Sequence, residues 1–376
     1  MRVLFASLPS IGHLYPLVPI AWAAKAAGHE VLFASFGESK VIAQAGMAMV
    51  DIAPDLTQRQ LFIDFQHRHG DVNDRIRAGE ESDELEGVHW GTFGEWLADG
   101  AVAAAQAWRP DLVVYERMAP FGLLAAAVLG VPAVRHQLGI DPSPLHQLRH
   151  MTAALERHGV PDLTDDDVPW IDLARSDRGG LPLRPVQYNG GVVLPPWLMA
   201  PRERPRIAIT VGTIVPRTQG VGVVDRILSF ASEFDADFVL AMEARDSDKL
   251  GTLPANVRAG GWLPMNALLP YCSAVVHHGG CGTMYAAIDA GVPQLLLPYG
   301  ASDRHVNADN VVARGIGLAS APDEVTADHV RRLITDDALR TATLAYRAEL
   351  AELPSPSEFF ATLAETVRRS DQRVGH

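Results

Sequence analysis

The stretch with the clearest chemical potential is glycine-rich and runs His277-His278-Gly279-Gly280-Cys281-Gly282-Thr283. An apolar run typical of a strand precedes it, and an alanine-rich run typical of a helix follows it. Glycines let backbone N–H groups approach a ligand closely, and the first turn of a helix offers free N–H groups and the positive end of its dipole. This combination predicts a diphosphate site.

Within this stretch, Gly280, Gly282 and Thr283 are the candidate phosphate contacts, with Thr283 also offering its hydroxyl. His278 is expected to add a ring N–H. His277 and His278 would face opposite ways at the end of a strand, so only one is expected to touch the phosphate. The spacing is neither the dinucleotide fingerprint nor a P-loop, and a tight turn holding a packed histidine is the structural alternative.

A second chemical candidate is His13, within Ser10-Ile11-Gly12-His13-Leu14-Tyr15-Pro16. This segment follows the first apolar run and precedes the first predicted helix. Ligand sites in open α/β sheets lie at the carboxyl ends of the strands, and a histidine there can accept a proton near neutral pH. A lone histidine before a helix is more often structural or simply exposed, so the pattern alone leaves both readings open.

Strands alternate with helices in the elements that must position His13. The predicted strands of the first half are 3–6, 31–35, 49–52, 111–115 and 133–136, and the predicted helices are 16–27, 41–45, 90–108 and 121–129. This alternation predicts a doubly wound parallel sheet. Residues from about 54 to 87 are polar and weakly periodic, which is typical of a functional or mobile segment.

The same alternation restarts after a proline-rich stretch, 196–205, that is typical of an interdomain linker. Its strands are expected at 206–211, 237–241, 257–260, 274–277 and 294–298, and its helices at 222–233, 282–290, 304–314 and 356–369. Ser355, Pro356 and Glu358 combine a first-turn proline with a capping box at the start of the last helix. We therefore expect an α/β chain with two Rossmann-like domains that face each other across a cleft. The boundaries are 1–195, linker 196–205, 206–355, and a C-terminal helix and tail, 356–376, that returns to the first domain.

The composition narrows the classes of function. The formal net charge is −13 and no block of Lys and Arg is present, which argues against a nucleic-acid-binding face. Only Cys272 and Cys281 occur, so neither a disulfide framework nor a zinc pattern is indicated. The apolar stretch 118–134 is interrupted by Gly and Pro and is too short to cross a membrane. With no signal-peptide profile at the N-terminus, we expect a cytoplasmic protein with no membrane association.

The glycine-rich stretch is part of a longer pattern that is similar to the signature of a known family. Residues 278–283, followed by Gly291-Val292-Pro293-Gln294, Pro298, Asp303 and Asn307, resemble the donor-site signature of the GT-B-fold, UDP-glycosyltransferase-like enzymes of glycosyltransferase family 1. The nearest likeness is to bacterial natural-product glycosyltransferases of the antibiotic and macrolide type. The match extends from Val211 to about Gly317 in the same order and spacing.

The resemblance implies a role for each matching residue of the second domain. Trp262 would stack on the donor base, with Leu263 beside it, and Thr213 would face the diphosphate. Asp303 would hold sugar hydroxyls, followed by Arg304 where the family usually has Gln. Because of that departure, a dTDP-linked deoxysugar and a UDP-sugar both stay open as the donor. Without the family, a core position is the simpler reading of the tryptophan.

In the first domain, the G-H-x-x-P arrangement is similar to the segment that carries the family's catalytic histidine, which implies that His13 is the general base. Glu116 stands where the family places an acid, more often Asp, that orients the histidine. A surface carboxylate paired with Arg117 is the alternative. The resemblance further implies an inverting single displacement without cofactor or metal, so the Asp-x-Asp at 246–248 is not assigned to one.

The acceptor is expected to be a small polyketide- or macrolide-type aglycone of antibiotic biosynthesis, bound by apolar walls. Candidate contacts are Ile11, Phe65 and Trp90. A nucleotide-sugar epimerase or hydrolase, and a non-catalytic auxiliary protein, share this fold and stay open as alternatives. The sequence does not distinguish the sugar, the acceptor, an O-, N- or C-glycosidic product, a homodimer, or a need for an activator protein.

Overall fold

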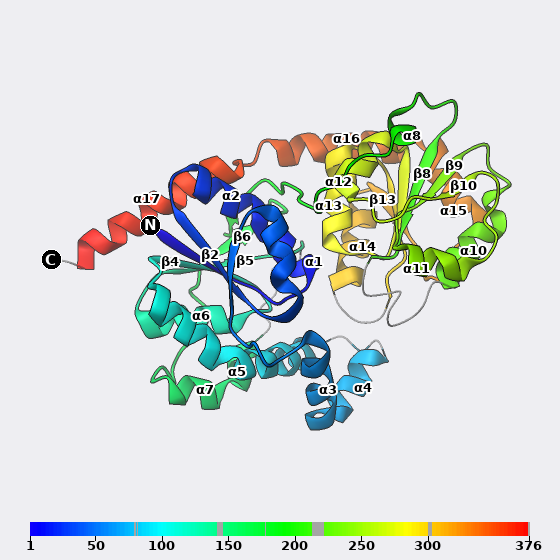
Figure 1. The fold of residues 1–376 in the computed structure, drawn as a ribbon. Coiled ribbons are helices and arrows are strands. Elements are labelled where there is room, and N and C mark those ends of the chain that lie inside the picture. Colours follow the sequence, from blue (N-terminus) through cyan, green and yellow to red (C-terminus); the bar gives the residue numbers. More distant parts are fainter. Residues whose placement is uncertain are drawn as a thin grey trace. The chain divides into compact units, whose positions relative to one another are not determined.

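The chain folds into two units, each built on its own parallel sheet. The computed structural model describes residues 1–78, 80, 82–140, 146–176, 178–212, 222–299 and 303–374, without the side chains of 38, 40 and 368–374. Unit 1 comprises Met1–Tyr188 together with Glu352–His376, and unit 2 comprises Asn189–Ala351 (Figure 1). The last helix, α17 (Pro356–Val374), packs against α2 (Val18–Ala26) of unit 1, as expected from the sequence.

The segment 196–205, expected to be the linker, is part of unit 2. Residues Pro196–Met199 form the short helix α8, and the Leu198 side chain is fully buried in a core cluster of this unit. The guanidinium groups of Arg206 and Arg258 lie over the Trp197 ring, at 5.6 and 4.7 Å from its centroid. These apolar and cation–π contacts attach the proline-rich segment to unit 2, so the chain passes between the units at Tyr188 and Asn189 instead.

Unit 1 is organised around a sheet in which every paired strand is parallel. Its order is β3-β2-β1-β4-β5-β6-β7. The strands are β1 (Arg2–Ala6), β2 (Glu30–Ser35), β3 (Ala48–Asp51), β4 (Leu112–Glu116), β5 (Ala133–His136), β6 (Trp170–Asp172) and β7 (Leu181–Pro182). The buried apolar runs of β1 and β4 suit strands covered on both faces. In Figure 1, α2 and α17 lie on one face of this sheet and α5, α6 and α7 on the other.

The polar region from 54 to 87 is helical for most of its length. The helices of unit 1 are α1 (Ile11–Leu14), η1 (Tyr15–Leu17), α2, η2 (Gly37–Ala45), α3 (Gln58–Arg68), α4 (Gly70–Arg77), α5 (Asp83–Trp108), α6 (Pro120–Leu129), η3 (Gln147–His150), α7 (Thr152–Arg157) and α17. The Thr57 hydroxyl accepts a hydrogen bond from the Gln60 amide and caps α3, whose buried side chains are Leu61 and Phe65. The Ser82 hydroxyl likewise caps α5, which begins before the expected residue 90.

Unit 2 repeats the architecture with a parallel sheet of order β10-β9-β8-β11-β12-β13. The strands are β8 (Arg206–Thr210), β9 (Asp237–Leu240), β10 (Val257–Ala259), β11 (Ala274–His277), β12 (Gln294–Leu296) and β13 (Gly317–Ala319). The helices are α8, α10 (Gly222–Ala231), α11 (Ala244–Ser247), η4 (Asp248–Leu250), α12 (Met265–Leu268), η5 (Leu269–Tyr271), α13 (Cys281–Ala290), α14 (Asp303–Ala313), α15 (Ala327–Thr335) and α16 (Asp337–Ala351). The glycine-rich stretch thus joins β11 to α13, as the sequence predicts.

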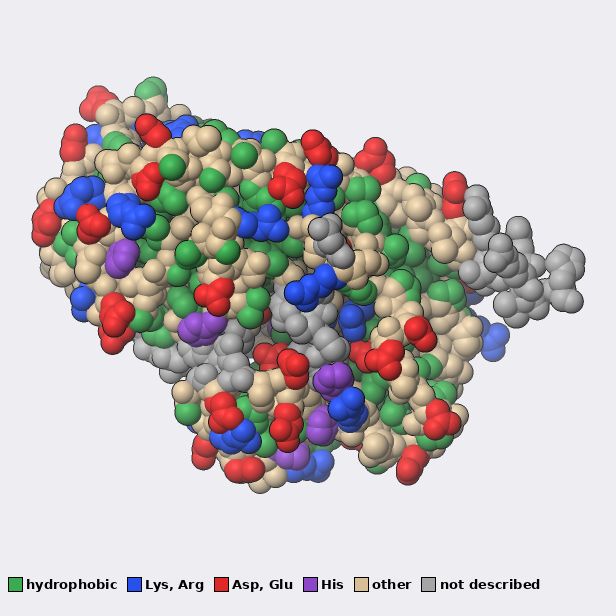
Figure 2. Space-filling model, turned by 180° about the vertical axis from the view of Figure 1, so that it is seen from behind, with side chains coloured by type: hydrophobic (Ala, Val, Ile, Leu, Met, Phe, Trp, Pro, Cys, Tyr) green, Lys and Arg blue, Asp and Glu red, His purple; other side chains and the backbone are tan. Residues whose placement is uncertain are grey.

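The surface carries charges of both signs. Figure 2 shows acidic, basic and histidine side chains interspersed over the visible face, with no continuous basic area among the described residues there. Within the described ranges, no helix is long and apolar enough to cross a membrane.

A glycine on α6 brings this helix close to β1, which precedes the candidate base, and to β4, which carries its partner. A Cβ added at Gly122 would lie 2.6 Å from Ala6 Cβ and 2.7 Å from Tyr115 Cβ. We expect Gly122→Ala to lower the stability of unit 1 by about 1–3 kcal/mol, because overpacking forces the helix away from the sheet. Thermal unfolding measures this. Gly70→Ala is the matched control, since nothing lies within 4 Å of its Cβ position; equal midpoints for both variants would contradict the expectation.

Candidate active site

The structure brings His13 and Glu116 into direct contact. His13 lies in α1, whose start is capped by the Ser10 hydroxyl accepting from the Gly12 amide, and Glu116 is the last residue of β4. His13 Nδ1 is 3.1 Å from Glu116 Oε1. Because β1 and β4 are neighbours and parallel, the loop after β1 and the end of β4 meet at the same edge of the sheet.

Backbone groups hold the Glu116 carboxylate in this orientation. Its Oε1 also accepts a hydrogen bond from the Leu8 amide at 3.2 Å, and its Oε2 accepts one from the Met118 amide at 2.7 Å. The glutamate side chain is fully buried, whereas 17% of the His13 side chain is exposed. The burial of Glu116 contradicts the alternative of a surface carboxylate paired with Arg117.

This geometry determines which nitrogen of the His13 imidazole carries the hydrogen. An ionised carboxylate only accepts hydrogen bonds, so Nδ1 of His13 carries the hydrogen that faces Glu116. In that tautomer Nε2 has the lone pair and can take a proton from an acceptor. The buried negative charge also stabilises the imidazolium that such a transfer produces.

The three candidate acceptor contacts have different surroundings. The Trp90 ring lies 6.0 Å from the His13 ring, centroid to centroid, and Ile11 shares α1 with His13. Both are partly exposed. Phe65 is fully buried and packs against His89 and Phe93 at 4.6 and 5.6 Å. Trp90 and Ile11 are therefore near His13, whereas Phe65 supports the helices from inside.

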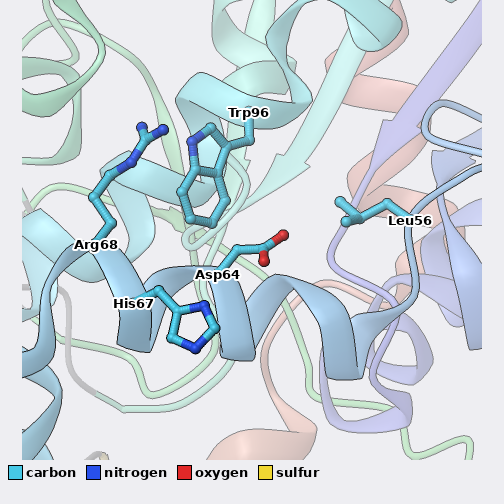
Figure 3. Close-up of a pocket in the computed structure, with 5 residues that line it drawn as sticks. All are labelled: Leu56, Asp64, His67, Arg68 and Trp96. Carbon is cyan, nitrogen blue, oxygen red and sulfur yellow. The ribbon is translucent and has the colours of Figure 1, made fainter.

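Unit 1 also has an open pocket of about 610 Å³ between α3 and α5. Figure 3 shows side chains from both helices around it, with Asp64 between Leu56 and Trp96 and the Arg68 guanidinium beside the indole. The Arg68 guanidinium carbon is 5.0 Å from the centre of the Trp96 ring. The lining contains none of the residues predicted to take part in catalysis.

In unit 2, His277 has a structural role. Its Nδ1 accepts a hydrogen bond from the Gly279 amide at 3.2 Å, so its Nε2 carries the hydrogen and donates to Gln294 Oε1 at 3.0 Å. Burial lowers the pKa of His277 to about 4, which keeps the ring neutral at physiological pH. This histidine ties the glycine-rich turn to β12 and has no nitrogen left for a ligand.

The neighbouring His278 is partly exposed and has a different environment. Its ring makes an angle of 86° with that of His277. A Cβ added at Gly212 or Gly280 would approach the His278 ring to 2.5 or 2.6 Å, so only glycine at these positions leaves room for it. Its Nδ1 is buried and has no hydrogen-bond partner among the described residues. Burial first, and then the positive charge of Arg304, hold the pKa of His278 well below its usual value.

The first turn of α13 lies directly after this histidine. Gly280 is the N-cap residue and offers no side chain to the free amides. The Thr283 amide donates to the Gly280 carbonyl at 3.1 Å within the helix, which differs from the expectation that this amide faces a phosphate. The hydroxyl of Thr283 and the amide of Gly282 are then the groups that could serve an anion here. Thr213, the other expected diphosphate contact, lies outside the described residues.

Helix α14 presents the two residues expected near the sugar. The Asn307 side-chain amide donates to the Gly279 carbonyl at 2.9 Å and to Asp303 Oδ2 at 3.2 Å. Arg304 donates to the Tyr299 carbonyl at 2.5 Å, and its Cβ would lie 3.1 Å from a Cβ on Gly279. Asp303 and Arg304 are therefore held against the turn that carries His278.

The two residues expected at the donor base differ in exposure. The Trp262 side chain is 43% exposed, so it is not a core tryptophan and its ring is accessible for stacking. Leu263 is buried in a core cluster of unit 2 and would touch a ligand through its backbone alone. Within the Asp-x-Asp at 246–248, Asp246 forms a local ion pair with Lys249 at 2.7 Å.

Family models and curated relatives match this chain over most of its length. Models of the Erythromycin biosynthesis protein CIII-like domains match residues 22–212 (N-terminal domain) and 225–366 (C-terminal domain). The elloramycin glycosyltransferase ElmGT of Streptomyces olivaceus is 36% identical over 96% of this chain and 97% of its own.

The solved structures that resemble this chain are also glycosyltransferases. The glycosyltransferase SnogD from Streptomyces nogalater has a TM-score of 0.83 and 35% identity, covering 98% of this chain and 99% of that one. The glycosyltransferase VinC, solved in complex with dTDP, has a TM-score of 0.81 and 30% identity, covering 98% of this chain and 100% of that one.

Together the two parallel-sheet units and these matches define the chain as a glycosyltransferase of the GT-B fold. More narrowly, it belongs to the Erythromycin biosynthesis protein CIII-like family, which confirms the likeness to bacterial natural-product glycosyltransferases.

The buried histidines predict a specific loss of stability in acid. Burial lowers the pKa of His277 and of His136 to about 4. It lowers the pKa of His89, whose Nε2 is buried although the residue is partly exposed, to about 3. Between the ordinary histidine pKa near 6.5 and these values, the unfolded chain binds more protons than the folded one, so the free energy of unfolding falls as the pH falls. Urea unfolding at pH 7, 6, 5 and 4.5 measures the slope. A free energy of unfolding that stays constant from pH 7 to 4.5 would contradict neutral buried rings.

Proposed function

We propose that this protein is an inverting glycosyltransferase that moves a deoxysugar from a dTDP-sugar to a polyketide- or macrolide-type acceptor, with His13 as the general base. The observation that carries the proposal is the contact of 3.1 Å between His13 and the buried Glu116. The donor base is inferred from VinC, whose structure holds dTDP. The acceptor class is inferred from the family named for erythromycin biosynthesis and from the elloramycin enzyme ElmGT.

In the proposed reaction, Nε2 of His13 takes the proton of the acceptor nucleophile as that atom forms a bond to the anomeric carbon. The bond between the anomeric carbon and the phosphate oxygen breaks, and its electron pair leaves with the diphosphate. His278, the Thr283 hydroxyl and the start of α13 would hydrogen-bond the leaving group as its charge grows. The single displacement inverts the anomeric centre. We include in the proposal that no metal takes part, so EDTA should leave the rate unchanged.

Replacing the proposed base should slow the reaction without weakening the binding of the donor. We expect His13→Ala to lower turnover by roughly 10²–10⁴, the usual contribution of a general base, and to leave the affinity for dTDP unchanged. The measurement is product formation with a panel of dTDP-deoxysugars and polyketide aglycones. His67→Ala, which removes an exposed histidine of the same unit, is the control. A His13→Ala enzyme as fast as the His67→Ala enzyme would remove His13 from the mechanism.

Replacing the proposed phosphate contact should have the opposite signature. We expect His278→Ala to weaken dTDP binding by roughly 10–100-fold, because a hydrogen bond to a charged group is worth about 1.5–3 kcal/mol. Calorimetric titration with dTDP and with UDP measures this and also tests the choice of donor base. His13→Ala serves as the control in the same titration. Unaltered dTDP and UDP affinities in His278→Ala would show that the diphosphate site is wrongly assigned.

A further inference from the structure

Asn189 is a polar residue that no part of the mechanism above uses. It is the first residue of unit 2 and precedes Gly190 and Gly191. The residue before it, Tyr188, is fixed in unit 1, where its ring packs edge-on against Tyr15 and Trp22 at 4.8 and 5.1 Å. Asn189 is partly exposed and is accessible to a ligand.

A backbone contact determines which way the Asn189 amide points. Asn189 Oδ1 accepts a hydrogen bond from the Asn266 amide at 3.0 Å. A backbone N–H can only donate, so the side-chain atom that faces it must be the oxygen. The NH₂ group of Asn189 therefore faces away from this backbone amide.

The NH₂ group lies next to the first turn of α13. Its nitrogen is 3.8 Å from the position that a Cβ on Gly282 would take. Among the hydrogen bonds of the described residues, none is donated by this nitrogen. The amides at the start of α13 are donors too, and the N-cap residue Gly280 has no side-chain acceptor for them.

Donors that face the same space cannot satisfy one another. An anion that lies between an amide NH₂ and the positive end of a helix can accept hydrogen bonds from both. The arrangement is typical of an anion-binding site, with neutral N–H groups from two separate segments of the chain. The segment 189–191 thus brings a side chain to the place where the proposed function puts the donor diphosphate.

We infer that Asn189 binds the diphosphate of the nucleotide-sugar donor through its side-chain NH₂. The inference rests on the proposed function, because it takes the diphosphate to lie at the start of α13. As the bond to the sugar breaks, negative charge grows on the diphosphate, and the Asn189 amide can strengthen its hydrogen bond without any change of position. Asn189 is thus a further residue that binds and stabilises the leaving group.

The substitution Asn189→Asp separates this role from a purely structural one. The aspartate keeps an oxygen for the Asn266 amide, so the anchor is retained. Its second oxygen replaces the NH₂ group beside α13, where a carboxylate suits the helix dipole in the absence of ligand. The variant should therefore unfold at the same temperature as the wild type or at a higher one. A bound diphosphate, however, would meet a like charge in place of a donor.

The experiment is calorimetric titration of dTDP into the wild type, Asn189→Asp, Asn189→Ala and Asn310→Asp, together with thermal unfolding of each. Asn310→Asp is the control for charge, because Asn310 bonds to the Val306 carbonyl further along α14. We expect the dissociation constant for dTDP to rise at least about tenfold in Asn189→Asp and less in Asn189→Ala, consistent with loss of a hydrogen bond to a charged group. Asn310→Asp should stay within about twofold of the wild type.

The outcomes separate this inference from the proposed function. Wild-type affinity in both Asn189 variants would overturn the role of Asn189 and leave the dTDP site intact. A wild-type protein that is folded and does not bind dTDP would overturn the donor site itself. An equal loss of affinity for dTDP in Asn189→Asp and Asn310→Asp would also overturn the inference, because it would show an effect of net charge alone. If Asn189→Asp does not fold, the comparison of Asn189→Ala with the wild type decides.

Discussion

A carboxylate that is buried must be surrounded by hydrogen-bond donors, and at the end of β4 this requirement determines where the proposed base, His13, lies. Glu116 has no exposed surface, and removing a charge from water costs several kcal/mol unless partners replace the solvent. The Leu8 and Met118 amides supply two of these partners and His13 the third. The Leu8 amide reaches Glu116 because β1 and β4 are adjacent, so the sheet order itself builds the site. Helix α6 approaches both strands closely at Gly122.

In unit 2, the site proposed for the diphosphate offers mainly neutral hydrogen-bond donors. An acidic protein with a net charge of −13 has no general attraction for a diphosphate, so binding must be local. The structure concentrates N–H donors at the start of α13 and beside it, and holds the nearby histidines neutral by burial. Arg304 adds a positive charge close to His278, where it further lowers the pKa of that ring. An anion there would be bound mainly by oriented dipoles, which need little rearrangement when charge moves during a reaction.

Much of this arrangement could be predicted from local patterns, and the remainder depends on contacts between distant residues. Apolar runs located β1, β4 and β11, and the Ser355 and Glu358 pair that starts α17 was recognisable because a capping box is a local interaction. Helices α3 and α4 were not predicted, since α3 buries only Leu61 and Phe65 and α4 buries no side chain. No local sequence pattern indicates that Trp262 is exposed while its neighbour Leu263 is buried. The same holds for the position of Asn189 beside Asn266, which is 77 residues away.

Histidines at strand ends show why residue type and position do not by themselves identify a base. His13, His136 and His277 all lie at or just beyond the carboxyl end of a strand. His136 is even paired in register with Glu116, whose charge raises its pKa, yet burial outweighs that effect and the pKa falls to about 4. His277 is buried as deeply and both its nitrogens are used within the fold. Only His13 combines a carboxylate at hydrogen-bonding distance with an exposed edge, so of these three rings it alone can exchange a proton with an acceptor and have the resulting charge stabilised.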